Sequence, residues 1–88
     1  MTLIHNLKCV QPWFSRVSAE EKTVEIRKYD RNFNVGDRLC LSEYDPEKKT
    51  FSGRYIEVEV LHIFYDHEFE GLAKGYCAMS ILKLKEGN

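Results

Sequence analysis

Residues 22–37 restrict the fold more than any other stretch, because polar and apolar side chains alternate along the first part and a Gly-Asp turn closes the last. The alternation runs over five residues: Thr23, Val24, Glu25, Ile26 and Arg27. In a β-strand successive side chains point to opposite faces, so the two apolar residues share one face and the three polar residues share the other. The pattern predicts a strand over residues 22–29, either at a surface edge or beside a small polar cleft that fixes a ligand.

The size and charge of the chain limit the kinds of function that it can have. Its 88 residues suffice for one domain with a small core, and the 43% hydrophobic content is close to the average for globular proteins. The formal net charge of -1 at pH 7 excludes a global basic field of the kind that drives non-specific binding to nucleic acids or membranes. Any nucleic-acid site must therefore be a local patch, and we expect no membrane partner.

The three cysteines, Cys9, Cys40 and Cys77, lie far apart and form no CxxC pair, so the sequence indicates neither a zinc knuckle nor a disulfide framework. Each lies in an apolar stretch and is expected to be a small buried residue. Free thiols of this kind fit a reducing compartment, and we expect a cytoplasmic protein. Residues 1–5 lack the apolar core of a signal peptide, and no apolar run is long enough to cross a bilayer.

Alternating patterns bounded by turn residues predict a mainly β protein. The five expected strands cover residues 5–10, 22–29, 38–44, 54–65 and 76–84. The first of one or two short helices should begin near Pro12. Its inward side would carry Trp13, Phe14 and Val17. Because short turns join the strands, we expect antiparallel pairing in a small closed or half-open barrel, with residues 85–88 frayed at the end.

Several short motifs distributed along the chain resemble a known family. They are His5-x-Leu7-Lys8, Trp13-Phe14, Lys22-Thr23-x-Glu25-x-Arg27-x-x-Asp30-Arg31-x-Phe33-x-x-Gly36-Asp37, Leu41-x-Glu43-Tyr44, Gly53-Arg54 and Gly75-Tyr76. These motifs resemble the ASCH (activating signal cointegrator homology) domains of the PUA-like superfamily, and among them short stand-alone members, mostly from bacteria and phages, of unknown function. The resemblance covers nearly the whole chain and implies one domain over residues 1–88, a small PUA-like antiparallel β-barrel. It also implies a cleft beside the first helix, which in such domains is proposed to bind RNA or a nucleotide.

Some small ASCH proteins are amidohydrolases that deacetylate acetylcytidine, and the resemblance implies which residues would take part in such a reaction. Lys22 matches the lysine of those enzymes, but Glu25 replaces their threonine nucleophile, three positions later. Thr23 could take its place only with a shifted strand register, and the late glutamate has only the loop candidates Glu68 and Glu70. The chain is therefore predicted to be a binding module, with an amidohydrolase that uses Lys22 as the alternative.

The main functional prediction is a module that binds RNA or a nucleotide in a polar cleft without catalysis. Seven side chains are expected to line this cleft: Lys8, Trp13, Lys22, Thr23, Glu25, Arg27 and Arg31. Arg27 would contact a phosphate or a base, and Glu25 would orient Arg27 or accept a hydrogen bond from an exocyclic amine. The alternative is an exposed Glu25–Arg27 pair on an outer strand face, which contributes only about 0–1 kcal/mol. For Trp13, core packing is expected and stacking on a base is the alternative.

Other polar residues are assigned to a turn, a rim or a loop. Gly36 is expected at a backbone conformation that other residues resist, and Asp37 is expected to accept hydrogen bonds from nearby amides. Five side chains could form a basic rim near the cleft: His5, Lys8, Lys28, Arg38 and Arg54. Four further residues have side chains that can bind metals, but their spacing matches no standard metal site. We therefore expect a solvated loop there, and no metal or other cofactor. The four are His62, Asp66, His67 and Glu68.

A protein-interaction module is the third functional alternative. Aromatic residues around Phe51 and Tyr55, or at positions 64–65, could meet a partner protein, although scattered surface aromatics are common. We expect a monomer, with a dimer as the alternative. Because recognition in the cleft would be local and hydrogen-bonded, binding to long nucleic acid should be weak and should depend only slightly on salt.

Overall fold

The computed structural model describes residues 2–88, and Met1 lies outside the described part. Within it, one sheet of five strands is accompanied by one short α-helix and one turn of 3-10 helix. The elements, in chain order, are β1 (Ile4–Cys9), α1 (Trp13–Ser18), β2 (Val24–Lys28), β3 (Arg38–Asp45), β4 (Thr50–Tyr65), η1 (Asp66–Glu68) and β5 (Tyr76–Gly87). Neither helix in this part of the chain is long and apolar enough to cross a membrane. The prediction of a mainly β fold is confirmed.

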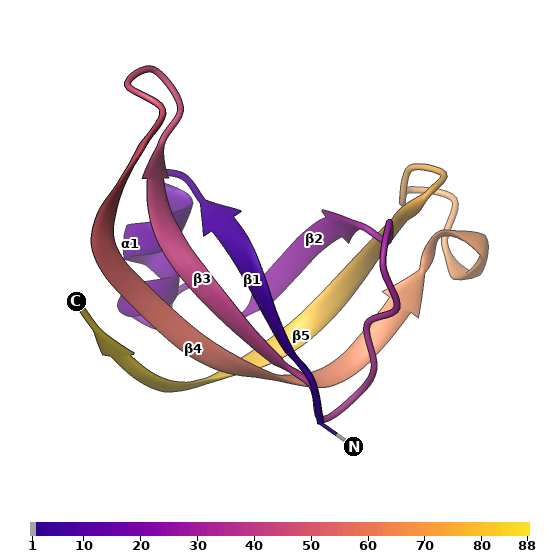
Figure 1. Ribbon diagram of the computed structural model, residues 1–88. Helices are drawn as coiled ribbons and strands as arrows, with labels where there is room; N and C mark the ends of the chain where they lie inside the picture. Colours follow the sequence, from indigo (N-terminus) through magenta and orange to yellow (C-terminus); the bar gives the residue numbers. More distant parts are fainter. Residues whose placement is uncertain (1) are drawn as a thin grey trace.

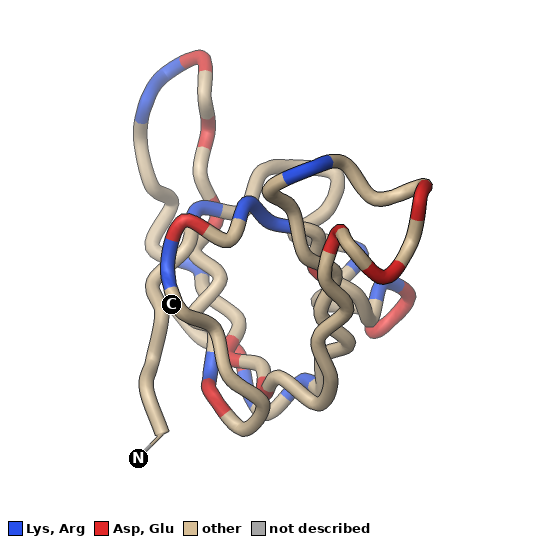
Figure 2. The backbone as a smooth tube through the Cα atoms, turned by 90° about the vertical axis from the view of Figure 1, so that its right-hand side faces the viewer, with Lys and Arg blue, Asp and Glu red and all other residues tan. Residues whose placement is uncertain are grey.

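The strands are ordered β1-β3-β4-β5-β2, so β1 and β2 are the two edges of the sheet. The long strands β4 and β5 curve strongly, and the sheet curls into a half-barrel (Figure 1). In the view of Figure 2 the backbone winds into a ring. Of the two forms expected, a closed or a half-open barrel, the structure has the half-open one.

One strand pair departs from the expected antiparallel pattern. β1 runs parallel to β3, whereas the β3–β4, β4–β5 and β2–β5 pairs are antiparallel. After β1 the chain passes through α1 and then forms β2 at the far edge of the sheet, before it returns to β3 beside β1. Parallel neighbours require such a crossover, so the expectation of antiparallel pairing throughout is wrong at this edge.

The core fills the inside of the curled sheet and is closed by α1. Its buried apolar residues are Leu7, Cys9, Phe14, Val17, Phe33, Leu39, Leu41, Ile56, Val58, Val60, Ile63, Cys77, Met79 and Ile81. A fully buried aliphatic side chain of this kind stabilises a fold by roughly 1.5–3 kcal/mol. Cys9 and Cys77 are buried as expected, but Cys40 is only partly buried.

The helix α1 buries only one side. Phe14 and Val17 are buried, but Trp13 is 52% exposed, so the expected core position of Trp13 is wrong. Phe14 and Val17 lie three residues apart on the same side of the helix, while Trp13 is displaced from Phe14 by about 100° around the axis. A helix of six residues covers the core with a single side, which leaves the indole at the surface.

The C-terminal strand is longer than expected. β5 extends to Gly87, so the expectation that residues 85–88 are frayed is wrong for most of that segment. Glu86 pairs with Ile56 on β4, and Ser18 Oγ donates a hydrogen bond to the Glu86 carboxylate at 2.8 Å. The end of β5 is therefore held both by β4 and by the end of α1.

Candidate functional site

The polar face of β2 points into the half-barrel, and its apolar face points outward. Glu25 is only 3% exposed, whereas its neighbour Ile26 is 58% exposed. On β5 the residue opposite Glu25 is Met79, which is fully buried, so Glu25 takes a core position in the sheet. The alternative of an exposed Glu25–Arg27 pair on an outer strand face is therefore wrong, because the carboxylate turns towards the core.

Two cations bind the buried carboxylate of Glu25, one through each oxygen. Lys22 Nζ donates to Oε1 at 2.6 Å, and Arg27 Nε donates to Oε2 at 2.8 Å. Removing a carboxylate from water costs several kcal/mol unless it is paired, so these two bonds permit Glu25 in the interior. We call these three residues the Glu25 network.

The same two cations satisfy carbonyl groups at the edges of the sheet. Arg27 Nη2 donates to the backbone carbonyl of Lys8 on β1, the opposite edge, at 2.8 Å. Lys22 Nζ also donates to the carbonyl of Val24. The carbonyl of Thr23 accepts a hydrogen bond from the N–H of Ile81 on β5. Because successive carbonyl groups of a strand point in opposite directions, the carbonyl of Val24 faces the open edge of β2. We call the gap between the outer edges of β1 and β2 the seam. Along it, Lys22 and Arg27 donate hydrogen bonds to backbone carbonyls that have no neighbouring strand to pair with.

Two clefts lie along the seam, with Arg27 between them. The apolar cleft has a volume of about 520 Å³ and the basic cleft a volume of about 430 Å³. Three residues border both clefts: Lys8, Ile26 and Arg27. The apolar cleft is completed by Cys9, Val10, Trp13, Lys22, Val24 and Glu25. The basic cleft is completed by Asn6, Leu7, Lys28, Asp30, Arg31, Phe33 and Tyr76.

Most of the predicted ligand-binding residues meet at the apolar cleft. Those that border it are Lys8, Trp13, Lys22, Glu25 and Arg27. Arg31 borders the basic cleft instead, where its side chain lies 3.7 Å from the carboxylate of Asp30. Thr23 borders neither of these clefts and instead lines a small hollow with Val17 of α1 and Ile81 of β5. The strand begins only after Thr23, so its side chain does not join the polar row of β2.

The apolar cleft has an exposed indole and a buried thiol in its lining. Trp13 provides the indole, and Cys9 provides the thiol. Burial and the charge of Glu25 raise the pKa of the Cys9 thiol to about 11, although Arg27 and Lys22 act in the opposite direction. Cys9 is therefore protonated at neutral pH and is a poor nucleophile.

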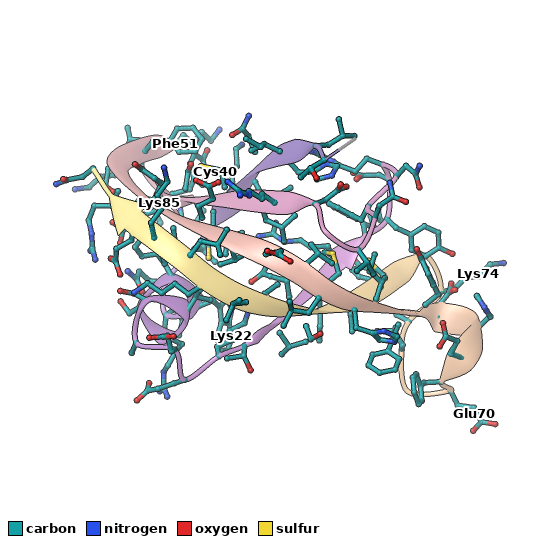
Figure 3. The ribbon with its side chains drawn as sticks, turned by 90° about the horizontal axis from the view of Figure 1, so that it is seen from below. Lys22, Cys40, Phe51, Glu70, Lys74 and Lys85 are labelled. Atoms are coloured by element: carbon teal, nitrogen blue, oxygen red, sulfur yellow. The ribbon has the colours of Figure 1, made fainter. Side chains whose placement is uncertain are left out.

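The residues assigned to the amidohydrolase alternative do not gather around Lys22. Glu25, at the position of the missing threonine, already binds Lys22 Nζ. Glu68 lies in η1, where its carboxylate accepts a hydrogen bond from the backbone N–H of Tyr65 at 3.2 Å. Figure 3 shows Glu70 at the end of the molecule far from Lys22. Neither late glutamate therefore reaches Lys22.

His5 is an internal residue and does not belong to a basic rim. It is buried, and its Nε2 lies 2.8 Å from Oδ2 of the buried Asp37. Asp37 also accepts hydrogen bonds from the backbone N–H groups of Leu3 and Asn34, so its expected role as an acceptor for nearby amides is confirmed. Burial raises the pKa of Asp37, but the bonds from His5 and from the two amides lower it by more, so the net shift is downward.

The other predicted rim residues are dispersed. Lys8 and Lys28 border the clefts. Arg38 instead forms an ion pair with Glu57 at 3.1 Å, and Arg54 forms one with Glu43 at 3.6 Å. The position of His5 could have been recognised from its spacing, because it lies two residues before the buried Leu7 and so shares its face of β1.

The residues with metal-ligating chemistry near the end of β4 have other contacts. His62 packs against Phe64, with ring centroids 4.5 Å apart. The carboxylate of Asp66 accepts hydrogen bonds from the N–H of Gly75 at 2.6 Å and from the hydroxyl of Tyr29 at 3.2 Å. In the chain from residue 2 to residue 88, no three His, Cys, Asp or Glu side chains lie close enough together to hold a metal ion.

An apolar strip crosses the outside of the sheet. Ile26 on β2 lies opposite Ala78 on β5, which lies opposite Phe64 on β4. The ring of Phe69 packs on that of Phe64, with centroids 5.1 Å apart. The strip meets the clefts at Ile26, which borders both of them, whereas Phe64, Phe69 and Ala78 border neither. A partner on the strip can therefore be distinguished from a ligand in a cleft by its effect on these three residues.

Two comparisons with known proteins give matches. Residues 4–81 match the family model described as "Domain of unknown function (DUF3850)", and this range includes every residue that borders the two clefts. The "Uncharacterized 12.9 kDa protein in GpA 3'region" of Escherichia phage P2 is 35% identical over 63 residues, which are 72% of this chain and 56% of the phage protein. The chain thus spans about half the length of the curated relative that it matches.

Proposed function

This chain belongs to the DUF3850 family, and we propose that it binds RNA or a nucleotide in the apolar cleft. The observation that carries the proposal is the position of Glu25, a buried carboxylate that two cations hold beside a cleft with an exposed tryptophan. A few fixed polar groups in a mostly apolar cleft are the usual arrangement of a site for a small ligand.

Trp13 and Glu25 would divide the recognition of a base between stacking and hydrogen bonding. The exposed indole offers a face for a base, and such stacking contributes roughly 1–3 kcal/mol. A carboxylate has about four lone-pair positions, and the bonds from Lys22 and Arg27 occupy one on each oxygen. The remaining positions can accept hydrogen bonds from an exocyclic amine, so the site favours bases that carry an amino group over uracil.

We assign the chain to the ASCH-type, PUA-like domains as part of the same proposal. Two observations support the assignment: the curled half-barrel, and the cleft beside α1 at which Lys22, Glu25 and Arg27 of the resembling motif meet. The contacts of Lys22 favour binding over catalysis, because Glu25 engages its ammonium group. The protonated thiol of Cys9 is not a substitute for the missing nucleophile.

An NMR titration of the labelled protein tests the proposal. The additions are the common ribonucleosides, their monophosphates, acetylcytidine and short single-stranded RNA. We expect amide shifts at Lys8, at Trp13 and over residues 22–27. The absence of shifts with every ligand, or shifts confined to Phe64, Phe69 and Ala78 on the outer apolar strip, would contradict binding in the cleft. Release of acetate from acetylcytidine by the protein, and not by its Lys22→Ala variant, would contradict the non-catalytic role.

A pair of matched variants sharpens the titration. Trp13 and Phe69 are both 52% exposed, but only Trp13 borders the apolar cleft. We expect Trp13→Ala to weaken or abolish the ligand-induced shifts, while Phe69→Ala leaves them in place. If both variants weaken binding equally, the aromatic surface acts non-specifically and the cleft is not the site.

A further inference from the structure

We propose that the basic cleft holds a phosphate group, so that the ligand of this protein is a nucleotide or single-stranded RNA and not a free nucleoside. This inference rests on the proposed function, because the base of the same ligand would occupy the apolar cleft. The two clefts share Lys8, Ile26 and Arg27. A ligand that fills the apolar cleft therefore meets the basic cleft at Arg27.

The distribution of charge separates the two clefts. Three arginine and lysine side chains bring positive charge to the basic cleft: Arg27, Lys28 and Arg31. Lys8 also borders this cleft, but its ammonium group lies 4.4 Å from the centre of the Tyr44 ring, outside both clefts. One carboxylate, that of Asp30, borders the basic cleft with them. The carboxylate of the apolar cleft, Glu25, is shared between Lys22 at 2.6 Å and Arg27 at 2.8 Å. The excess of positive charge in the basic cleft is local, because the chain as a whole has a formal net charge of -1.

The cations of the basic cleft retain free hydrogen-bond donors. A guanidinium group has about five N–H donors, and Arg27 uses one for Glu25 and one for the carbonyl of Lys8. The contact of Arg31 with Asp30 is long, at 3.7 Å, and exposed, so it holds Arg31 weakly. Lys28 enters no ion pair with any residue of the described chain. Arginine and lysine with free donors are suited to phosphate oxygens.

The arrangement predicts a ligand that lies along the seam. Its base stacks on Trp13 in the apolar cleft, its ribose passes Arg27, and its phosphate lies between Lys28 and Arg31. Such a ligand places only one or two phosphates against the protein. The logarithm of the binding constant should therefore fall by roughly 0.7–1.4 for each unit of log salt concentration, the small dependence expected for few phosphates on a single strand.

Affinities of matched ligands test this inference. Each nucleoside is compared with its 3′- and 5′-monophosphates and with inorganic phosphate, by titration at fixed ionic strength. We expect at least one monophosphate to bind about tenfold more tightly than its nucleoside, because it adds charge-assisted hydrogen bonds. The double variant Lys28→Ser/Arg31→Ser should lose this gain and keep the affinity for the nucleoside. Its control, Lys48→Ser/Lys74→Ser, removes two exposed cations outside both clefts and should keep the gain.

The outcomes separate this inference from the proposed function. If nucleosides bind and their monophosphates bind no better, the phosphate site is wrong and the proposed function stands. If nucleosides, monophosphates and short single-stranded RNA all fail to bind, both are wrong, even where inorganic phosphate alone binds. If the control variant loses the gain as fully as the Lys28→Ser/Arg31→Ser variant, the gain comes from overall charge and the phosphate site is wrong.

Discussion

The guanidinium of Arg27 on β2 donates to the backbone carbonyl of Lys8 on β1 at 2.8 Å, so one side chain joins the opposite edges of a single sheet. The same guanidinium donates to the buried carboxylate of Glu25, also at 2.8 Å. Because both bonds depend on one planar group, the closure of the seam is coupled to the pairing of the carboxylate. A change at Arg27 should therefore affect both the stability of the fold and the shape of the two clefts.

Replacing Arg27 by lysine tests this coupling. The variant Arg27→Lys keeps the charge but loses the fork geometry, so one ammonium cannot reproduce both bonds in place. We expect the free energy of unfolding to fall by about 1–2 kcal/mol, measured by urea denaturation. The control is Arg16→Lys, since Arg16 lies exposed at 3.7 Å from Glu21 and should change stability by less than about 0.5 kcal/mol. Equal stability of the two variants would mean that Arg27 does not hold the seam.

Neutralising Glu25 should be more damaging than neutralising a surface glutamate. In Glu25→Gln the cations Lys22 and Arg27 stay partly buried beside an uncharged amide. Breaking one partner out of a buried ion pair costs roughly 3 kcal/mol or more. Glu21→Gln, on the exposed pair with Arg16, should cost less than about 1 kcal/mol. Chemical denaturation of both variants checks the difference, and a Glu25→Gln protein as stable as Glu21→Gln would show that the network does not stabilise the fold.

The strands and their buried faces could be predicted, because the alternation of apolar and polar residues along each strand determines them. On β4, the alternation of Ile56, Val58 and Val60 identifies a buried face, and all three residues are buried. The parallel pairing of β1 with β3 could not be predicted in this way, because it depends on where β2 joins the sheet. Spacing along one strand contains no information about the order of strands across a sheet.

The candidate site could be predicted only in part, for a related physical reason. The alternation on β2 separates Glu25 from Ile26, but which face points inward depends on partners that the strand itself does not determine. The buried carboxylate is tolerated because Lys22 and Arg27 reach it, and Arg27 also reaches the distant edge at Lys8. The exposure of Trp13 likewise follows from which side of a short helix meets the core.

Two neighbouring aromatic residues on α1 should give opposite phenotypes. Phe14 is fully buried, so Phe14→Ala should destabilise the protein by about 3–5 kcal/mol through the loss of buried surface and the cavity that it leaves. Trp13 is half exposed, so Trp13→Ala should change stability little but weaken nucleotide binding by roughly 5- to 100-fold. Thermal unfolding and ligand titration of both variants check this. A Trp13→Ala protein that is strongly destabilised and still binds would reverse the assignment.

The stability of the protein should fall in acid through Asp37. Burial raises the pKa of Asp37 from its ordinary value of 3.8, but the bonds from His5, Leu3 and Asn34 lower it by more. A carboxyl group with a lower pKa in the folded state binds a proton more readily in the unfolded state. Its stabilising contribution is therefore complete above about pH 5 and is lost as the pH falls through the folded pKa, below about 3.8.

The variant Asp37→Asn isolates this contribution. The amide cannot accept charge-assisted hydrogen bonds from His5 and the two backbone amides, so the variant should be less stable than the parent protein at pH 7. Between about pH 5 and pH 2 its free energy of unfolding should decline less steeply, because the group that gains a proton on unfolding is gone. Asp30→Asn serves as the control, since Asp30 is exposed and outside the core. A parent and an Asp37→Asn protein with the same acid slope would mean that other carboxylates dominate acid unfolding, and that the His5–Asp37 pair contributes the same free energy at every pH in this range.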